Sequence, residues 1–197
     1  MAVMKKVERG ELDINKKLTI IESDVNNQSE TDSHLSAGTK MTVLELLRYM
    51  IKYSSNTAKN ALKRQLESVE IDEVFNHVGI PNPYQLGGES NTSVRQFTRL
   101  FKALYFSTYL AKQSSELILE LATETRTESL IAAGVPWEVQ VAHKYGEGDK
   151  LLHDCGIVYA LNNPYFLCIM TNNMEYAKAR TLIKQISAEV YSFVKNQ

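Results

Sequence analysis

The spacing of apolar residues changes from a helical period to a strand period near residue 138. Before this point apolar side chains recur every three or four residues in short segments separated by polar stretches. After it, three segments are rich in β-branched and aromatic residues and are separated by the sequences EGDK and LNNP; they cover 138–146, 151–160 and 165–172. These segments predict an antiparallel meander. The amphipathic pattern that begins near Met174 predicts a helix at the end of the chain.

The helical part of the chain carries start and stop signals. Thr42 and Glu45 have the spacing of a capping box at the start of a helix over 42–53. Further helices are predicted after the sequence SSN at 54–56, over 71–78 and ending at Gly79, from about 94 to 104, and over 114–122. The polar residues 22–40 predict a long surface loop. Helices followed by strands and one last helix predict an α+β fold, a mixed α/β sandwich.

The first residues, MAVMKKVERGEL, have a helical apolar face that ends at Gly10. No capping residue precedes this face. We therefore expect the chain to begin in the middle of a helix.

Composition restricts the class of function. The chain has 197 residues, 44% hydrophobic and 23% charged, and a net charge of −1, which indicates one globular domain and argues against nucleic acid as a partner. Apolar runs such as YFLCIM are too short to span a membrane, and no signal peptide is recognisable.

The chain contains two cysteines, Cys155 and Cys168. They lack CxxC spacing and a neighbouring His cluster, so we expect no metal site, and no cofactor is predicted. They should lie on neighbouring antiparallel strands. We expect free thiols, because direct cross-strand pairs rarely suit disulfide geometry.

Two places carry candidate chemistry. Ser54, Ser55 and Asn56 stand between two predicted helices, and Lys144 stands inside a strand pattern. The ordinary interpretations are an N-cap for the first and a solvent-facing lysine on an edge strand for the second. The alternative interpretation is that the hydroxyls and the amide point into a cleft.

Taken together, these segments resemble the penicillin-recognising serine enzymes, the class A β-lactamases and penicillin-binding DD-peptidases. Their signature elements are Ser-x-x-Lys, Ser-Asp-Asn and Lys-Thr-Gly. SSNTAKNAL is similar to the family's SDNTAxNxL, MTVLELL to the helix before it, HKYGEG and HDCGIVY to the third and fourth strands, and MAVMKKVERGEL to the second half of the helix that carries the nucleophile. The resemblance covers essentially the whole chain. It implies one β-lactamase-like domain over 1–197 that lacks its N-terminal part, with a helical subdomain at 25–125 and with sheet strands and the C-terminal helix at 136–197.

The resemblance also implies roles for two catalytic residues. Lys144 would hold the substrate carboxylate and keep the Ser54 hydroxyl polarised, while Ser54 would relay a proton to the leaving group. The two side chains must then lie together, and a structure that separates them would contradict both the fold and the function.

Four further residues would bind the substrate. Asn56 would hydrogen-bond the substrate amide, and Gly146 would let the substrate approach the strand edge. The backbone N–H of Glu147 would form one half of an oxyanion hole. Tyr145 occupies the threonine position of the Lys-Thr-Gly element, where a phenol keeps a hydroxyl but alters the carboxylate pocket.

The chain departs from the family pattern in other places. The Ser-x-x-Lys is absent from its place in the order and would lie about two helical turns before Met1, so we expect the chain as printed to be inactive. Ser55 replaces the usual Asp. Only PNPYQLGGES separates Ile80 from the next helix, and its one acid, Glu89, is a weak candidate for the base that activates the deacylating water, which predicts slow deacylation.

Three functional hypotheses follow. The first is a serine acyl-transfer hydrolase that acts on β-lactams or D-alanyl-D-alanine peptides. The second is a D-alanyl-D-alanine carboxypeptidase or penicillin-binding protein with slow deacylation, and the third is a non-catalytic module that binds cell-wall peptide or a protein. The expected partner is a small β-lactam or a peptidoglycan stem peptide, and the resemblance implies an extracytoplasmic location.

His143 and the neighbours His153 and Asp154 invite a catalytic-triad interpretation. Residues adjacent on a strand point to opposite faces. We therefore interpret these three residues as structural.

Overall fold

The computed structural model describes residues 1–26, 32, 34–82, 93–125 and 130–197. Its helices are α1 (Ala2–Glu8), α2 (Val43–Lys52), α3 (Asn56–Lys63), α4 (Ser68–Val78), α5 (Val94–Tyr105), α6 (Lys112–Thr123) and α7 (Tyr176–Lys195), with short 3-10 turns η1 (Glu22–Asp24) and η4 (Ile131–Gly134). Its strands are β1 (Lys17–Thr19), β2 (Lys40–Thr42), β3 (Val141–Gly148), β4 (Leu151–Val158) and β5 (Tyr165–Met170). The α+β prediction is confirmed.

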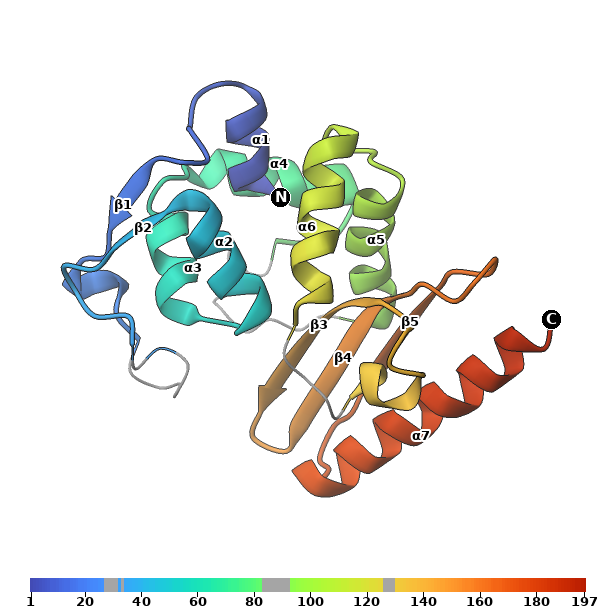
Figure 1. Cartoon of the computed structure of the whole chain (residues 1–197). Helices are drawn as coiled ribbons and strands as arrows, with labels where there is room; N and C mark the ends of the chain where they lie inside the picture. The colour runs from blue at the N-terminus through green and yellow to red at the C-terminus, as the bar shows by residue number, and fades with distance from the viewer. Residues whose placement is uncertain (27–31, 33, 83–92, 126–129) are drawn as a thin grey trace.

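The main sheet is an antiparallel meander in the order β3-β4-β5, as predicted. Helices α5 and α6 lie on one side of it and α7 lies on the other, while α1 to α4 extend away from the sheet beyond α6 (Figure 1). The division into a helical subdomain at 25–125 and a sheet part at 136–197 remains our proposal for the domain organisation.

Strand alternation gives the sheet two apolar faces. Ala142, Cys155 and Ile157 belong to the core shared with the helices, whereas Leu152 and Val158 pack with Ile183 of α7 and its neighbours. This follows from the period of two in a strand, which sends successive side chains to opposite faces. Residues of β3 and β4 thus reach either the helical side or the α7 side, according to position.

The predicted helix signals have the expected geometry. The Thr42 hydroxyl accepts from the Glu45 N–H at 3.1 Å, and the Glu45 carboxylate accepts from the Thr42 N–H at 2.7 Å, which completes the capping box of α2. Gly79 ends α4 with φ of 66°. The prediction missed β1 and β2, because strands of 3 residues are too short to show an alternation.

The expectation of free thiols is wrong. Cys155 and Cys168 lie on neighbouring strands as predicted, but they are directly opposed in the ladder and form a disulfide. Their Cα atoms are 3.9 Å apart, closer than the about 4.5 Å of a non-hydrogen-bonded antiparallel pair, and the two residues are direct partners in the ladder. The general preference against direct cross-strand disulfides did not hold at this pair.

The disulfide predicts a specific thiol count and a loss of stability on its removal. Thiol titration of the unfolded, unreduced protein should find no free thiol, and reduction should release both. Because the bond closes a loop with a separation of 13 residues, the double variant Cys155→Ala/Cys168→Ala should lose about 2–3 kcal/mol of unfolding free energy in urea. Full thiol titre before reduction would contradict the pairing.

Gly156 of β4 faces His143 across the ladder, and a side chain there has no room. A Cβ atom at Gly156 would lie 2.4 Å from the His143 Cβ and 2.5 Å from the Ala142 carbonyl oxygen. Gly156→Ala should therefore reduce the unfolding free energy by about 1–3 kcal/mol. Gly146→Ala on β3 is the matched control, because a Cβ there has no neighbour within 4 Å in the part of the chain that the structure describes. Equal stability of the two variants in urea unfolding would contradict this steric argument.

Candidate active site

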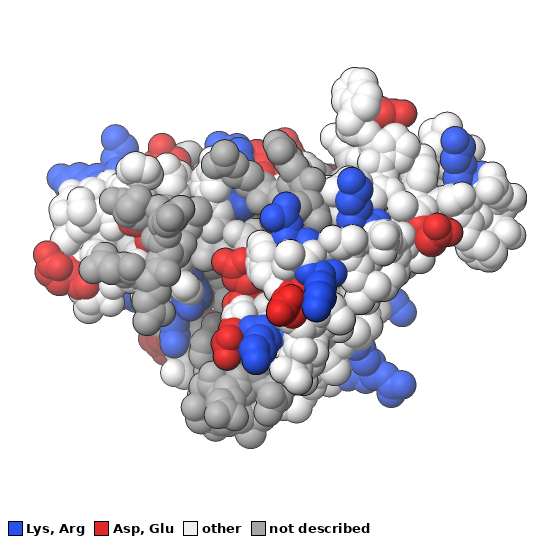
Figure 2. All heavy atoms as spheres, turned by 90° about the horizontal axis from the view of Figure 1, so that it is seen from below, with Lys and Arg blue, Asp and Glu red and all other residues white. Residues whose placement is uncertain are grey.

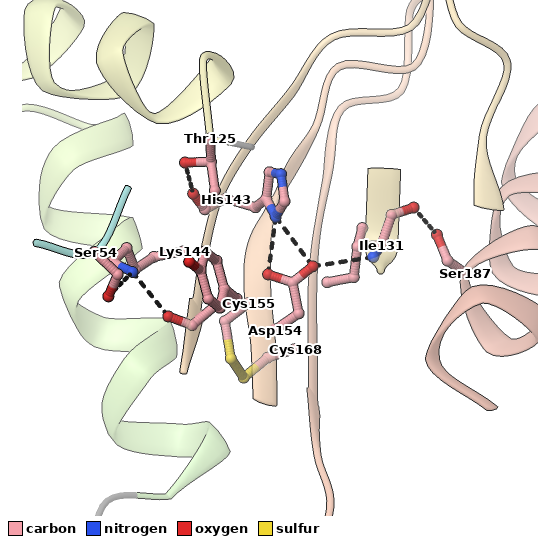
Figure 3. Close-up of polar contacts among 10 residues, drawn as sticks. Ser54, Thr125, Ile131, His143, Lys144, Asp154, Cys155, Cys168 and Ser187 are labelled. Atoms are coloured by element: carbon pink, nitrogen blue, oxygen red, sulfur yellow. Dashed lines mark hydrogen bonds and ion pairs between the residues drawn. A yellow bond between two sulfur atoms is a disulfide. The ribbon is translucent and has the colours of Figure 1, made fainter. Parts of the chain in front are cut away.

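Ser54 lies in the sharp turn that joins α2 to α3. Ser55 is the N-cap of α3, and its hydroxyl accepts from the Ala58 N–H at 3.0 Å. The capping interpretation is thus right for Ser55, while Ser54 stands outside the helix. Its φ is 56°, in the left-handed region that non-glycine residues seldom occupy. This turn directs the Ser54 hydroxyl toward β3 (Figure 3).

Lys144 reaches that hydroxyl from β3. Its Nζ donates to Ser54 Oγ at 2.7 Å and to the Tyr145 carbonyl oxygen at 2.9 Å. The ammonium also lies 4.4 Å from the centre of the Tyr145 ring, in a cation–π contact. The prediction that Ser54 and Lys144 meet is confirmed, and their contact joins the helical part to the sheet.

Burial lowers the pKa of Lys144 to about 8. The charges of Asp154 and Glu147 act in the opposite direction and raise it, but burial has the larger effect. Lys144 is therefore mainly protonated at neutral pH, and it loses its proton far more readily than an ordinary lysine.

A cleft of about 800 Å³ lies between α4 and α5 on one side and the sheet on the other. Phe75, Ile80, Pro81, Gln96, Phe97 and Leu100 line it from the helical part, and Lys144, Tyr145, Gly146, Glu147, Leu151, His153, Cys155, Met170, Thr171 and Asn172 line it from the sheet part. The space above Gly146 is open as far as the described residues go, since an added Cβ would meet none of their atoms within 4 Å. A ligand therefore has access to the β3 backbone beside Lys144.

The structure brings most of the predicted site residues together. Tyr145, Gly146 and Glu147 line the cleft beside Lys144, and Ser54 contacts Lys144 without being part of the lining. Asn56 is also outside the lining, and its Oδ1 accepts from Lys59 Nζ at 2.7 Å. Its predicted role in substrate binding remains a proposal. Glu89 lies outside the described residues.

His143 and Asp154 form a buried pair that the sequence did not predict. The His143 Nδ1 is 2.9 Å from Asp154 Oδ1, and the two side chains are 1% and 0% exposed. Both point to the α7 side of the sheet, away from Lys144 (Figure 3). Asp154 also accepts from the Ile131 N–H at 3.0 Å, while the Ser187 hydroxyl donates to the Ile131 carbonyl oxygen at 2.7 Å.

Because Ser187 bonds to backbone and not to imidazole, these groups do not form a catalytic triad. They connect β3, β4, η4 and α7. The strand register places His143 diagonally opposite Asp154. This contact could not be predicted from the residues next to either one in the sequence.

His153 is a cleft residue that the sequence interpretation left as structural. It lies opposite Gly146 in the ladder and lines the cleft. Its Nδ1 lies 3.2 Å from the Thr171 backbone nitrogen, which also donates to the Leu152 carbonyl oxygen at 3.1 Å. Strand alternation, which places residue 153 on the same face as Cys155, was the signal that could have found it.

The sequence does contain one Ser-x-x-Lys tetrapeptide, at Ser192–Lys195 near the end of α7. Ser192 is exposed, and α7 covers the face of the sheet opposite the helices (Figure 1). This tetrapeptide therefore does not replace the element expected beside Lys144.

Among the described residues, no three His, Cys, Asp or Glu side chains converge as a metal site would require. Within the same residues, no helix combines the length and the apolarity of a membrane span.

The antiparallel sheet flanked by helices is the fold of class A β-lactamases and of related penicillin-binding proteins. A sequence model of the beta-lactamase enzyme family matches residues 1–194, and the chain belongs to this family.

Curated relatives are consistent with this assignment. Beta-lactamase BRO-1 of Moraxella catarrhalis is 25% identical over 210 residues, which cover 95% of this chain and 67% of that protein. A beta-lactamase of Bacillus licheniformis is 28% identical over 149 residues, 68% of this chain and 48% of that protein. The chain thus spans between about half and two thirds of the length of these relatives.

Solved structures show the same fold. The structure of PBP-A is 25% identical, with a TM-score of 0.85 over 100% of this chain and 77% of that one. A mutant of PBP-A, solved as an acyl-enzyme complex with penicillin G, has a TM-score of 0.84 and covers 100% of this chain and 78% of that one. A beta-lactamase from Sphaerobacter thermophilus, 18% identical, shares the fold with a TM-score of 0.86 over 100% of this chain and 80% of that one.

The lowered pKa of Lys144 predicts a pH-dependent stability. Between about 8, its pKa in the fold, and 10.5, its ordinary value, the unfolded chain binds the proton and the folded chain does not, so stability rises with pH in this window. The unfolding free energy of wild type, relative to Lys144→Met, should rise by up to about 3 kcal/mol across the window. Below it, the burial penalty of the charged lysine is fully present.

Urea unfolding at several pH values measures this difference. Lys178→Met is the control, since Lys178 is exposed on α7 and its removal should give no slope in this window. If the difference in unfolding free energy between wild type and Lys144→Met does not change with pH, the lowered pKa of Lys144 is contradicted.

Proposed function

We propose that the protein is a serine acyl-transfer enzyme that acts on β-lactams or D-alanyl-D-alanine peptides. The observation that carries the proposal is the 2.7 Å contact between Lys144 Nζ and Ser54 Oγ beside a cleft whose strand edge is open at Gly146. A cation fixed next to a hydroxyl can bind a carboxylate and polarise the hydroxyl at the same time.

Each residue of the site has a role in this proposal. Lys144 anchors the substrate carboxylate, and Ser54 passes a proton to the leaving nitrogen. The N–H of Glu147 stabilises the oxyanion that develops on the substrate carbonyl. Asn56 binds the substrate amide, for which its side chain must exchange the bond from Lys59 for one to the substrate.

Tyr145 distinguishes this site from the Lys-Thr-Gly pattern. Its carbonyl oxygen and its ring both contact the Lys144 ammonium. A ring in that position shields one side of the cation, so the carboxylate must approach from the open Gly146 side. We infer a carboxylate pocket that differs in shape from one built with threonine.

The proposal assigns the acylated serine to none of residues 1–197. Ser54 contacts Lys144, and the proposal gives it the role of proton relay, while Ser192 lies on α7, across the sheet. In this proposal a segment other than residues 1–197 would have to supply the acylated serine and its lysine partner.

A second candidate is a penicillin-binding protein or D-alanyl-D-alanine carboxypeptidase with slow deacylation. The similarity to PBP-A favours it, because a PBP-A mutant was captured as a penicillin acyl-enzyme. The short segment that contains Glu89 supports the same candidate. A non-catalytic module that binds cell-wall peptide is the third, and the labelling experiment below distinguishes it.

Two features support a location outside the cytoplasm and a small ligand. The Cys155–Cys168 disulfide suits an oxidising compartment. On the face shown in Figure 2, basic and acidic side chains are interspersed, and the net charge of the chain is −1. A nucleic acid ligand would call for a concentrated basic surface.

Penicillin labelling tests the proposal. The full-length gene product, if it carries a Ser-x-x-Lys segment outside residues 1–197, should form a covalent adduct with a fluorescent penicillin, and the adduct should persist, whereas residues 1–197 alone should not be labelled. Mass spectrometry after penicillin treatment measures both. A stable adduct on the short chain would show that the nucleophile is misassigned, and rapid turnover by the long one would contradict slow deacylation. A long chain that binds but is never acylated would support the non-catalytic module.

In the full-length protein, Lys144→Ala should slow acylation. We expect the activation free energy to rise by about 2–4 kcal/mol, because the variant lacks the carboxylate anchor and the charge beside Ser54. Lys178→Ala is the control and should acylate at the wild-type rate, because the Lys178 side chain is exposed. An unchanged rate for Lys144→Ala would remove Lys144 from the mechanism.

A further inference from the structure

Asp32 is a buried carboxylate with no role in the mechanism above. It lies between η1 and β2, and only 2% of its surface is exposed. The sequence places it in a polar stretch where nothing indicates burial. A buried carboxylate is unfavourable unless it is hydrogen-bonded, so its partners define its role.

Among the described residues, the hydrogen-bond partners of the Asp32 carboxylate are at the start of α3. The Ser55 hydroxyl donates to Asp32 Oδ1, and Asp32 Oδ2 accepts from the N–H groups of Asn56 at 3.1 Å and Thr57 at 3.3 Å. A negative charge at a helix N-terminus is favourable, because the first N–H groups of a helix lack internal partners. One carboxylate thus holds three consecutive residues.

These three residues directly follow Ser54. The left-handed backbone of Ser54, with φ of 56°, persists only if its neighbours are fixed. On its other side, the Ser55 N–H donates to the Tyr49 carbonyl oxygen of α2 at 3.3 Å. Asp32 and α2 therefore hold the turn from two directions, and the Ser54 hydroxyl is presented to Lys144.

The position of this carboxylate explains a departure from the family motif. The middle motif Ser-Asp-Asn carries an acid in its second residue, where this chain has Ser55. Here the acid comes from a different segment and binds the hydroxyl of that same residue.

We propose that Asp32 is a positioning residue of the active site, which fixes the Ser54 turn with a carboxylate supplied from outside the motif. Its removal should let the turn relax and carry the Ser54 hydroxyl away from Lys144. Returning the carboxylate to residue 55 should restore the turn.

The experiment compares four variants of the full-length gene product. Asp32→Ala removes the carboxylate, Asp32→Asn keeps its size without its charge, and Asp32→Ser/Ser55→Asp moves the acid into the motif. Asp24→Asn is the matched control, because Asp24 is also a buried acid, 3% exposed, but pairs with Arg64 at the far end of α3.

The first readout is amide hydrogen exchange, which does not depend on the proposed function. Exchange at Asn56 and Thr57 should be roughly 10-fold faster in Asp32→Ala than in wild type, and the double variant should regain most of the protection. Asp24→Asn should leave these two amides unchanged. Wild-type exchange in Asp32→Ala would overturn the proposal.

The second readout rests on the proposed function. The limiting rate of acylation by a fluorescent penicillin should fall by about 10- to 100-fold in Asp32→Ala with little change in the apparent Kd, since a misplacement of about 1 Å can slow a reaction to this extent. Rescue by the double variant supports positioning. An equal loss of thermal stability in Asp32→Ala and Asp24→Asn with unchanged acylation would show a purely structural role.

Two outcomes separate this proposal from the preceding one. If wild type is never acylated, the proposed function fails, and amide exchange alone decides the role of Asp32. If Asp32→Ala does not fold, Asp32→Asn and the double variant carry the comparison, and a double variant without restored protection overturns the proposal.

Discussion

The hydrogen bond between Lys144 and Ser54 connects the two halves of the molecule at the point where the cleft begins. It requires an ammonium to be buried, which water would otherwise solvate, and the lowered pKa of Lys144 is the direct sign of that penalty. The penalty is tolerated because the ammonium has a hydroxyl, a carbonyl oxygen and an aromatic ring around it. A carboxylate ligand would complete the set, since it supplies the full negative charge that these neutral groups lack.

The rest of the structure keeps the two partners in place. On the sheet side, Lys144 is directly opposite Cys155, whose disulfide ties β4 to β5 beneath the cleft. On the other face, the buried pair of His143 and Asp154 fixes β3 and β4 against η4. The strand that carries Lys144 is thus held by polar links on the α7 face, and its neighbour β4 is held to β5 by a covalent one, in addition to apolar packing.

On the helical side Ser54 is held in position differently, because it lies in a turn and not in a helix or strand. A residue with positive φ depends on its neighbours for its conformation. The N-cap of α3, the end of α2 and the carboxylate of Asp32 provide that support. The hydrogen bond therefore joins a side chain of a strand to a side chain in a turn whose conformation is fixed by its neighbours. Acyl transfer requires groups that are held in place in this way.

The sequence by itself determined the helices, the meander and the pairing of Ser54 with Lys144 as candidate chemistry. These features rest on local signals: the capping box at Thr42, the glycine at 79, the change of period near 138, and short motifs whose order is similar to that of a known family. Such signals act over a few residues, so they can be read along the chain. They also placed both cysteines on neighbouring strands.

Only the tertiary structure decided the contacts that depend on register and on distant loops. The disulfide exists because Cys155 and Cys168 are directly opposed, and a shift of one residue would have separated them onto opposite faces. His143 reaches Asp154, not its sequence neighbours, because of the same ladder. Asp32 has no local signal for burial, since the described partners of its carboxylate lie more than 20 residues away in the sequence. Hydrogen bonds of this kind are specified by the geometry of the whole fold, and no short stretch of sequence contains that geometry.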